Sequence, residues 1–406
     1  MLYGRKFKND NIFSVENGTI IKNESYEKII YKVIDGEPFE VAEEEFVEMQ
    51  HKVTDDWHSV QTLYGVRQSI LKRSVLDNLI TMSVESSQKY DIKFLIVISS
   101  NTRELLDFDE LFVEDYQLYR LEIFIYDLQT SCQKYQDTLL SPDAIYEMEN
   151  KIYDMIQEII KYRKLQVLHL NTNYKYKLLF TAPQCGILLH EAIGHYVEFD
   201  NYSSFSHKFL QMGSKLIGAS ISVSDFCEYD SQGQLVPIPI KYDDFGHLCR
   251  DVQIIKNGVL IDTLSSKYGN QFITAEYKKI DRMKNLTCNI SCLSNKKSIK
   301  ISTYVLVKGT GYAYCTKKGN IEIEVTESYF CSSGSILGRL PLFYIKTNTL
   351  DLLSSLRNAG EGKNTWIHTR CVKQGSEKLV GMGGVAMECT MNISYDSWLY
   401  RDNIKE

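Results

Sequence analysis

The stretch Gly186–Asp200, "GILLHEAIGHYVEFD", decides how this chain is interpreted. Its two histidines, His190 and His195, are five residues apart. A common zinc-peptidase signature, H-E-x-x-H, spaces its histidines four apart instead. On an ideal α-helix, residues four apart are about 40° apart around the axis, whereas residues five apart are about 140° apart. An ideal helix therefore cannot point both histidines at one metal ion.

One extra residue must be absorbed if His190 and His195 are to converge. A π-bulge or an unwound turn before His195 would absorb it, and Gly194 is the residue here that most easily tolerates such a backbone. The alternative is a buried amphipathic helix whose two histidines are satisfied by hydrogen bonds. The chain has only eight histidines, and two of them flank a glutamate in this apolar segment, which favours a metal site.

The residue types in this stretch suit hydrolysis at a metal ion. Neutral imidazole is a good zinc ligand, and a catalytic zinc needs three protein ligands and one open position. Glu191 directly follows the first histidine, so it is expected to act as general base and then as general acid. Glu198 and Asp200 either orient the histidines as hydrogen-bond acceptors or lie on a solvated helix end. The sequence leaves both interpretations open.

Composition places the chain among globular proteins. It has 406 residues, 44% hydrophobic and 24% charged, so two or three domains are expected. The net charge of −6 gives no reason to expect nucleic acid or an anionic membrane as a partner. No apolar run approaches the ~20 residues that cross a bilayer, and the first residues lack the apolar core of a signal peptide. We therefore expect a cytoplasmic protein whose ten cysteines are mostly free thiols.

The pattern of helix-like and strand-like segments predicts an α+β fold, and strand-like segments become dominant after about residue 172. We expect an α/β region over residues 1–172 and a β-rich domain over residues 173–406. Asn17-Gly18 and Asp35-Gly36 predict hairpin turns. The predicted helices cover residues 40–53, the stretch from about Trp57 to Tyr90, residues 141–164 and residues 350–362. The predicted strands cover residues 92–99, 119–128, 176–182, 252–264, 301–314 and 320–330.

Several motifs resemble those of the TldD/PmbA family of metallopeptidases. The family's zinc-bearing members carry H-E-A-x-G-H followed by a glutamate and an aspartate, as residues 190–200 do here. Residues 242–268 resemble its aspartate-pair stretch, "DRMKNL" at residues 281–286 resembles its "PRMTN" segment, and residues 309–330 resemble its glycine-rich hairpin. The resemblance covers residues 174 to 395 and implies a TldD-like, motif-bearing metallopeptidase domain.

The resemblance also implies a third zinc ligand. The family uses a cysteine just upstream of a glycine-rich strand, and "TRCVKQGSEKLVGMGGVAM" places Cys371 there; Cys389 and Cys331 are the next candidates. A His, His, Cys set is coherent because zinc deprotonates the thiol. Three residues depart from the family pattern and bear on substrate range and partner geometry: Phe199 and Val372 replace glycines, and Asp281 replaces a proline.

The function that the resemblance implies is zinc-dependent hydrolysis of small or unfolded peptides. These include modified ribosomal peptides whose leader must be removed. The implied partner is a TldE/PmbA-like subunit that lacks the metal motif, forming a heterodimer, with a homodimer as the other option. Two alternatives stay open: a non-catalytic family subunit that supports a partner, and a metal-dependent amide hydrolase that acts on a non-peptide substrate.

Overall fold

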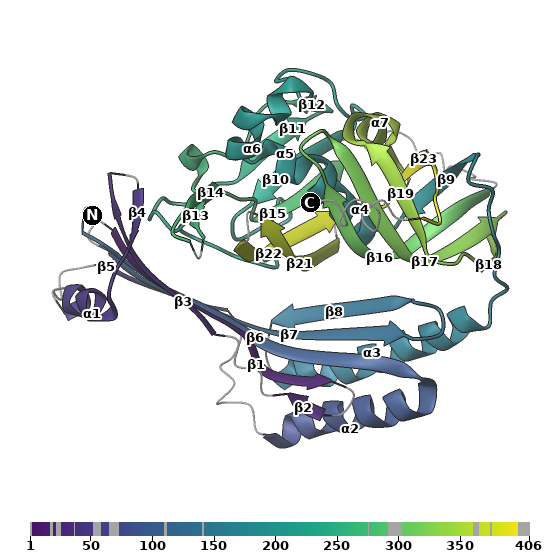
Figure 1. Cartoon of the computed structure of the whole chain (residues 1–406), viewed down its shortest axis with the longest axis horizontal. Coiled ribbons are helices and arrows are strands. Elements are labelled where there is room, and N and C mark those ends of the chain that lie inside the picture. Colours follow the sequence, from purple (N-terminus) through teal and green to yellow (C-terminus); the bar gives the residue numbers. More distant parts are fainter. Residues whose placement is uncertain are drawn as a thin grey trace.

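The chain forms the predicted α+β fold, in which strands from four sheets outnumber the helices (Figure 1). The computed structural model describes residues 2–16, 19–21, 26–35, 37–51, 58–64, 73–108, 112–139, 142–274, 276–290, 303–359, 365–373 and 376–396. The large sheet is built before residue 140, and the other three sheets are built after residue 174.

The N-terminal sheet has eight strands, in the order β4-β3-β1-β6-β7-β5, with β2 beside β1 and β8 beside β7. Its neighbours are antiparallel except for the parallel pair β5–β7. Both predicted hairpins are present, with Glu16 opposite Thr19 and Ile34 opposite Glu37; Asn17, Gly18 and Gly36 lie outside the described residues. The strands are β1 (Leu2–Glu16), β2 (Thr19–Ile21), β3 (Tyr26–Ile34), β4 (Glu37–Glu40), β5 (His58–Tyr64), β6 (Ile92–Asp107), β7 (Phe112–Asp127) and β8 (Gln133–Leu139).

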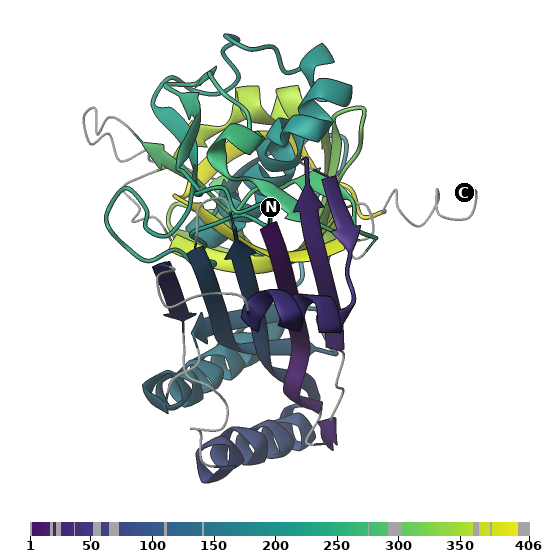
Figure 2. The same ribbon diagram turned by 90° about the vertical axis from the view of Figure 1, so that its left-hand side faces the viewer.

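Three helices accompany this sheet: α1 (Glu43–His51), α2 (Arg73–Tyr90) and α3 (Pro142–Arg163). Helices α2 and α3 cover the face of the sheet that points away from the C-terminal part (Figures 1 and 2). The predicted apolar stripe of α3 is buried at Met148, Ile152 and Ile159, because these positions recur at helical spacing and face the sheet. The side chain of Ile145 and the expected cap Ser141 lie outside the described residues.

The prediction of helix from about Trp57 to Tyr90 is wrong over its first part. Residues His58–Tyr64 form strand β5, which pairs in parallel with β7, and the described helix begins at Arg73. The residues of β7 that pair with β5 come more than fifty positions later in the chain, as His58 opposite Phe112 shows. Local periodicity does not reveal such a pairing, because tertiary context decides short segments.

The C-terminal part contains a six-stranded sheet, β12-β11-β10-β15-β22-β21, and a seven-stranded sheet, β18-β17-β16-β9-β23-β20 with β19 beside β17; β13 and β14 form a separate pair. The strands are β9 (Lys175–Phe180), β10 (Ile221–Phe226), β11 (Val252–Lys256), β12 (Val259–Leu260), β13 (Gln271–Ile273), β14 (Lys279–Asp281), β15 (Asn285–Ile290), β16 (Thr303–Cys315), β17 (Asn320–Ser332), β18 (Ser335–Arg339), β19 (Phe343–Asn348), β20 (Arg357–Asn358), β21 (Thr365–Lys373), β22 (Ser376–Gly384) and β23 (Met387–Asn392). The helix predicted for residues 350–362 is the shorter α7 (Thr349–Ser355), which Asn348 caps by accepting from Leu350 N.

The helix α4 (Ala182–Leu189) lies between these two sheets and contacts β22, β21 and β15 on one side and β16 and β9 on the other. Glycines allow the close approach to β22. A Cβ on Gly186 would lie 3.2 Å from Gly383 N, and a Cβ on Gly384 would lie 2.7 Å from Ala182 O. Helix α4 contains the first residues of the stretch Gly186–Asp200, so its tight packing fixes the position of that stretch.

The aspartate pair that the family resemblance singled out joins the two parts of the molecule. Asp244 accepts from Arg103 Nη1 at 3.3 Å and from Ile273 N at 2.8 Å, and it also pairs with Lys6. Asp243 accepts from backbone N–H groups of its own loop, at Phe245 and His247, and from Gln271 N. Because Lys6 and Arg103 belong to β1 and β6, Asp244 ties the N-terminal sheet to the C-terminal part, and Asp243 holds the loop that carries it.

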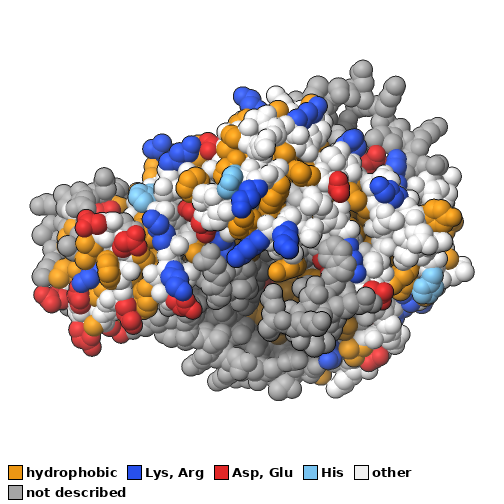
Figure 3. All heavy atoms as spheres, turned by 45° about the horizontal axis from the view of Figure 1, so that its top comes forward, with side chains coloured by type: hydrophobic (Ala, Val, Ile, Leu, Met, Phe, Trp, Pro, Cys, Tyr) orange, Lys and Arg blue, Asp and Glu red, His pale blue; other side chains and the backbone are white. Residues whose placement is uncertain are grey.

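Charged side chains are unevenly distributed over the surface. Figure 3 shows acidic side chains gathered at the end of the molecule formed by α1 and β4, where Glu43, Glu44 and Glu45 occupy the first turn of α1. Lysine and arginine side chains are interspersed with apolar ones over the adjoining C-terminal part. Within the described residues, none of the helices has the length and apolarity needed to span a bilayer.

Candidate metal centre

A π-helical turn separates the two histidines. Residues His190–Gly194 are π-helical, between α4 and the short helix α5 (His195–Val197), and α6 (Phe199–Ser204) follows. The His195 N–H donates to His190 O, five residues back, which is the bond that defines a π-turn. The extra residue that the spacing required is therefore absorbed as predicted, and both imidazoles come to the same side of the helix.

Gly194 is needed for a different reason from the one expected. Its φ of −50° and ψ of −59° are ordinary right-handed helical values that any residue adopts. However, a Cβ at this position would lie 2.6 Å from Met283 Sδ and 3.3 Å from Leu286 Cδ2. The glycine thus provides space for the neighbouring strand, and the expectation of a special backbone was wrong.

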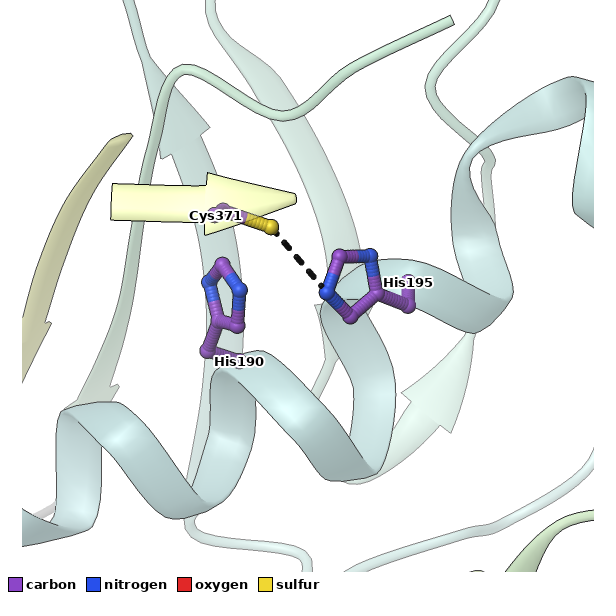
Figure 4. A group of neighbouring side chains, drawn as sticks. All are labelled: His190, His195 and Cys371. Atoms are coloured by element: carbon purple, nitrogen blue, oxygen red, sulfur yellow. Dashed lines mark hydrogen bonds between the residues drawn. The ribbon is translucent and has the colours of Figure 1, made fainter. Parts of the chain in front are cut away.

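Three potential metal ligands converge at this turn (Figure 4). The rings of His190 and His195 are 4.7 Å apart between centroids, with an interplanar angle of 81°. Cys371, on β21, places its Sγ 3.2 Å from His195 Nε2. One ligand atom from each of the three residues lies within 4.8 Å of the other two. In the described residues, the groups with such geometry include neither Cys331 nor Cys389.

The state of His190 fits a metal ligand better than a satisfied core residue. It is 2% exposed, and its Nδ1 has no hydrogen-bond partner among the residues that the structure describes. Burial, followed by the proximity of His195, lowers the pKa of His190 well below its ordinary value, so the imidazole is neutral. A buried polar atom without a partner is costly, and a zinc ion bound by two imidazoles and a thiolate would account for it.

Glu198 orients the second histidine. Its Oε2 lies 3.2 Å from His195 Nδ1, and its Oε1 accepts from Met283 N at 3.1 Å. Lys373 Nζ lies 2.9 Å from Oε2, and Arg282 Nε lies 3.6 Å from Oε1. Burial acts to raise the pKa of Glu198, but Lys373, His195 and Arg282 together hold it well below the ordinary value. Of the two interpretations of Glu198, the structure favours the acceptor, since a carboxylate on Nδ1 leaves Nε2 to face the metal.

Asp200 acts through a lysine instead of a histidine. Its Oδ1 lies 2.6 Å from Nζ of Lys373, which also donates to Asp281 O at 2.9 Å. Burial, and then the nearby Asp200 carboxylate, raise the pKa of Asp281 to about 6. Lys373 lies two residues beyond Cys371 on β21, so this contact joins the cysteine's strand to the helices that carry the histidines.

Glu191 is buried beside the ligand group, as its position next to His190 predicted. It is 8% exposed, and its Oε1 lies 3.9 Å from His190 Nε2. Burial raises the pKa of Glu191 above the ordinary value, which suits a carboxylate that must accept a proton. A second possible ligand group consists of Glu191, His195 and Cys315, again with one atom from each within 4.8 Å of the others.

A cleft of about 850 Å³ opens one helical turn from Glu191. It lies between β7, β8 and α3 of the N-terminal part and α4, β16, β21 and β22 of the C-terminal part. Ile187 lines it and precedes Glu191 by four residues, which places both near one face of the helix.

Sequence reasoning missed three residues that shape this centre: Lys373, Arg282 and Cys315. Arg282 donates to Cys371 O at 2.8 Å as well as approaching Glu198. It belongs to the "DRMKNL" segment, so the resemblance had marked the segment without giving a role to the residue. Neither Lys373 nor Cys315 carried a signal, because a lysine in a strand and one cysteine among ten are ordinary features.

Comparisons with known proteins identify the family of the C-terminal part. Residues 173–376 match the family model described as the PmbA/TldA metallopeptidase C-terminal domain. The Zinc metalloprotease TldD homolog of Saccharolobus solfataricus is 26% identical over 228 residues, which are 52% of this chain and 49% of that protein. The chain thus spans about half the length of this relative. The structure of TldE from Thermococcus kodakarensis has a TM-score of 0.63 at 14% identity and covers 97% of this chain and 95% of its own; this similarity shows the fold alone.

Proposed function

Because this chain belongs to the PmbA/TldD metallopeptidase family, we propose that it is a zinc-dependent peptidase that hydrolyses short or unfolded peptides. The observation that carries the proposal is the convergence of His190, His195 and Cys371 within 4.8 Å, with Glu191 buried beside them. A zinc ion held by these three residues would supply a Lewis acid for an amide carbonyl.

The chain's own residues would transfer the protons and hold the ligands in position. Glu191 accepts a proton from the attacking water and then delivers it to the leaving amine; its raised pKa helps both steps. With zinc on Nε2 of His195, Glu198 would accept the remaining ring proton from Nδ1 and so orient the imidazole beside Cys371. Lys373 and Arg282 neutralise Glu198 and at the same time hold the strand of Cys371.

The burial of the centre supports an unfolded peptide as the substrate. Glu191 and Cys371 are 8% and 5% exposed, so a folded protein would have to unfold locally to present a peptide bond to them. Global unfolding costs roughly 5–15 kcal/mol. The cleft between the two parts of the molecule is the natural route for an extended segment. Leader segments of modified ribosomal peptides fit this description.

We further propose that the chain works in the cytoplasm and pairs with a TldE/PmbA-like subunit, with a homodimer as the alternative. The fold similarity to TldE supports a related subunit as partner. Two competing functions remain: a non-catalytic subunit, which the intact ligand group disfavours, and a metal-dependent amide hydrolase that acts on a non-peptide substrate.

The test uses the zinc-loaded chain, alone and co-expressed with a motif-lacking homologue. It is incubated with a folded protein and with the same protein unfolded. We expect cleavage of the unfolded form only. We expect Glu191→Gln to keep its zinc, but its hydrolysis rate should fall by about 10²–10⁴-fold, because an amide cannot accept the proton. The exposed Glu276→Gln is the matched control and should cleave normally. Full activity of Glu191→Gln, or equal cleavage of the folded protein, would contradict the proposal.

A further inference from the structure

Cys315 differs from the other described cysteines in its exposure. It is partly exposed, whereas Cys132, Cys185, Cys227, Cys249, Cys288, Cys331, Cys371 and Cys389 are buried. It is the last residue of β16, and its neighbour Tyr314 is 49% exposed. Cys315 therefore lies where the buried centre meets the solvent.

Cys315 belongs to a second possible ligand group, which shares His195 with the first. Its Sγ, a carboxylate oxygen of Glu191 and a ring nitrogen of His195 lie within 4.8 Å of one another. Because Glu198 occupies His195 Nδ1, the nitrogen left for a metal is Nε2, which also faces Cys371. The two possible ligand groups thus meet at His195, with His190 and Cys371 in one and Glu191 and Cys315 in the other.

A direct bond keeps the two elements in register. Tyr196, the residue after His195, donates from its hydroxyl to the carbonyl of Thr316, the residue after Cys315, at 2.9 Å. Thr316 O also accepts from Gly319 N and its hydroxyl accepts from Asn320 N, which fixes the turn that follows β16. The position of Cys315 relative to the histidine helix is therefore built into the structure.

We propose that Cys315 is a displaceable fourth ligand of the metal. In the absence of substrate, its thiolate binds the zinc ion beside His190, His195 and Cys371, and a peptide carbonyl or water replaces it in the working enzyme. This inference rests on the proposed zinc site. The thiol proton is released to solvent on binding, since the thiolate is the form that ligates.

The chemistry of the donor set supports a thiolate at this place. Zinc sites with two histidines and two cysteines are common and four-coordinate, and they leave no position open. Glu191 is the competing donor in the second group, but zinc readily takes sulfur, and Glu191 must stay unbound to serve as a base. The resting centre is then closed, and substrate binding opens it by displacing a single partly exposed side chain.

The test counts thiolates on the metal with Co²⁺ in place of zinc. Thiolate-to-cobalt charge-transfer absorption should correspond to two thiolates in the unmodified chain and fall roughly twofold in Cys315→Ser, which still has three ligands. Cys331→Ser is the matched control, because the Cys331 thiol is buried on the next strand, β17, and it should leave the spectrum unchanged. An unfolded peptide added to the unmodified chain should lower the absorption to the level of Cys315→Ser.

A second measurement avoids variants altogether. Zinc should slow alkylation of Cys315 by iodoacetamide by about tenfold or more, and an unfolded peptide should restore it, as mapped by mass spectrometry. If the absorption responds to Cys371→Ser but not to Cys315→Ser, and zinc does not protect Cys315, the fourth-ligand inference is overturned while the zinc site stands. If no thiolate absorption appears at all, the proposed zinc site fails as well.

Discussion

His195 Nδ1 lies 3.2 Å from Oε2 of Glu198, a carboxylate with no solvent exposure. This contact fixes the orientation of the imidazole, and a metal bound at Nε2 would leave the ring proton on Nδ1, facing the carboxylate. The carboxylate can stay ionised while buried because Lys373 and Arg282 face it. In the proposed zinc site, a residue that does not touch the metal would thus set how well one of the ligands binds.

The Glu198 contact can be tested with Glu198→Gln, which preserves size but removes the charge. We expect zinc affinity to fall about 10–100-fold, because the amide neither fixes the tautomer nor strengthens the ligand. The measurement is competition for zinc against a chelator of known affinity. Glu388→Gln is the control, since Glu388 is also mostly buried beside a lysine but lies on β23. Unchanged zinc affinity in Glu198→Gln would show that His195 is held by other contacts.

Removal of single ligands should empty the site. The purified chain should carry about one zinc ion. His190→Ala or Cys371→Ala should each lose most of it, because each variant keeps only two of the three ligands of the proposed catalytic site, beside the displaceable Cys315. Elemental analysis of dialysed protein measures this directly. Cys389→Ala is the matched control, because Cys389 is buried on β23 outside both ligand groups. Full zinc content in Cys371→Ala would show that the third ligand is another residue.

A side chain at position 194 should disturb the centre through Met283. In Gly194→Val the new atoms overlap Met283, whose Sδ would be 2.6 Å from the Cβ. We expect a loss of about 1–3 kcal/mol in unfolding free energy and weaker zinc binding. The double variant Gly194→Val/Met283→Ala should recover part of both losses, with a coupling of about 0.5–3 kcal/mol.

Denaturant unfolding and chelator competition measure the two effects at position 194. Gly218→Ala is the control, because a Cβ there meets nothing closer than 3.6 Å. If Met283→Ala gives no recovery, the strain lies in the backbone of the π-turn and not in the contact with Met283.

Asp281 should make stability fall as the pH rises. Its pKa is about 6 in the folded chain and about 3.9 in an unfolded one, so the folded state binds more protons between those values. The unfolding free energy attributable to this carboxyl is therefore lost from about pH 4 to about pH 6. Asp281→Asn has no carboxyl to ionise, so the variant should avoid about 1–2 kcal/mol of this decrease in unfolding free energy. The figure is reduced to account for partial screening by solvent.

Urea unfolding at a series of pH values tests the Asp281 effect. The difference between Asp281→Asn and the unmodified chain should grow in favour of the variant as the pH rises to 7. The exposed Asp154→Asn provides the control and should show no such trend. A constant difference across the pH range would mean that Asp281 ionises normally in the folded chain.

Local features of the sequence were sufficient to predict the local structure of the centre. The five-residue spacing of His190 and His195 required either a π-bulge or an unwound turn because an α-helix has 3.6 residues per turn, and the structure contains the π-bulge. The hairpin turns and the apolar stripe of α3 followed in the same way from turn chemistry and periodicity. The pattern of helix-like and strand-like segments predicted the α+β fold, and the family resemblance, carried by short motifs, named Cys371.

The tertiary structure alone decided what surrounds these residues. Cys371 reaches His195 across 176 residues of sequence because β21 joins a sheet that packs against α4. Pairing with a distant strand made β5 extended where periodicity predicted a helix. Packing against Met283 explained Gly194, and long-range contacts brought Lys373, Arg282 and Cys315 to the site. Backbone geometry acts over a few residues and can be read along the chain, whereas sheet pairing and side-chain packing depend on which distant segments meet.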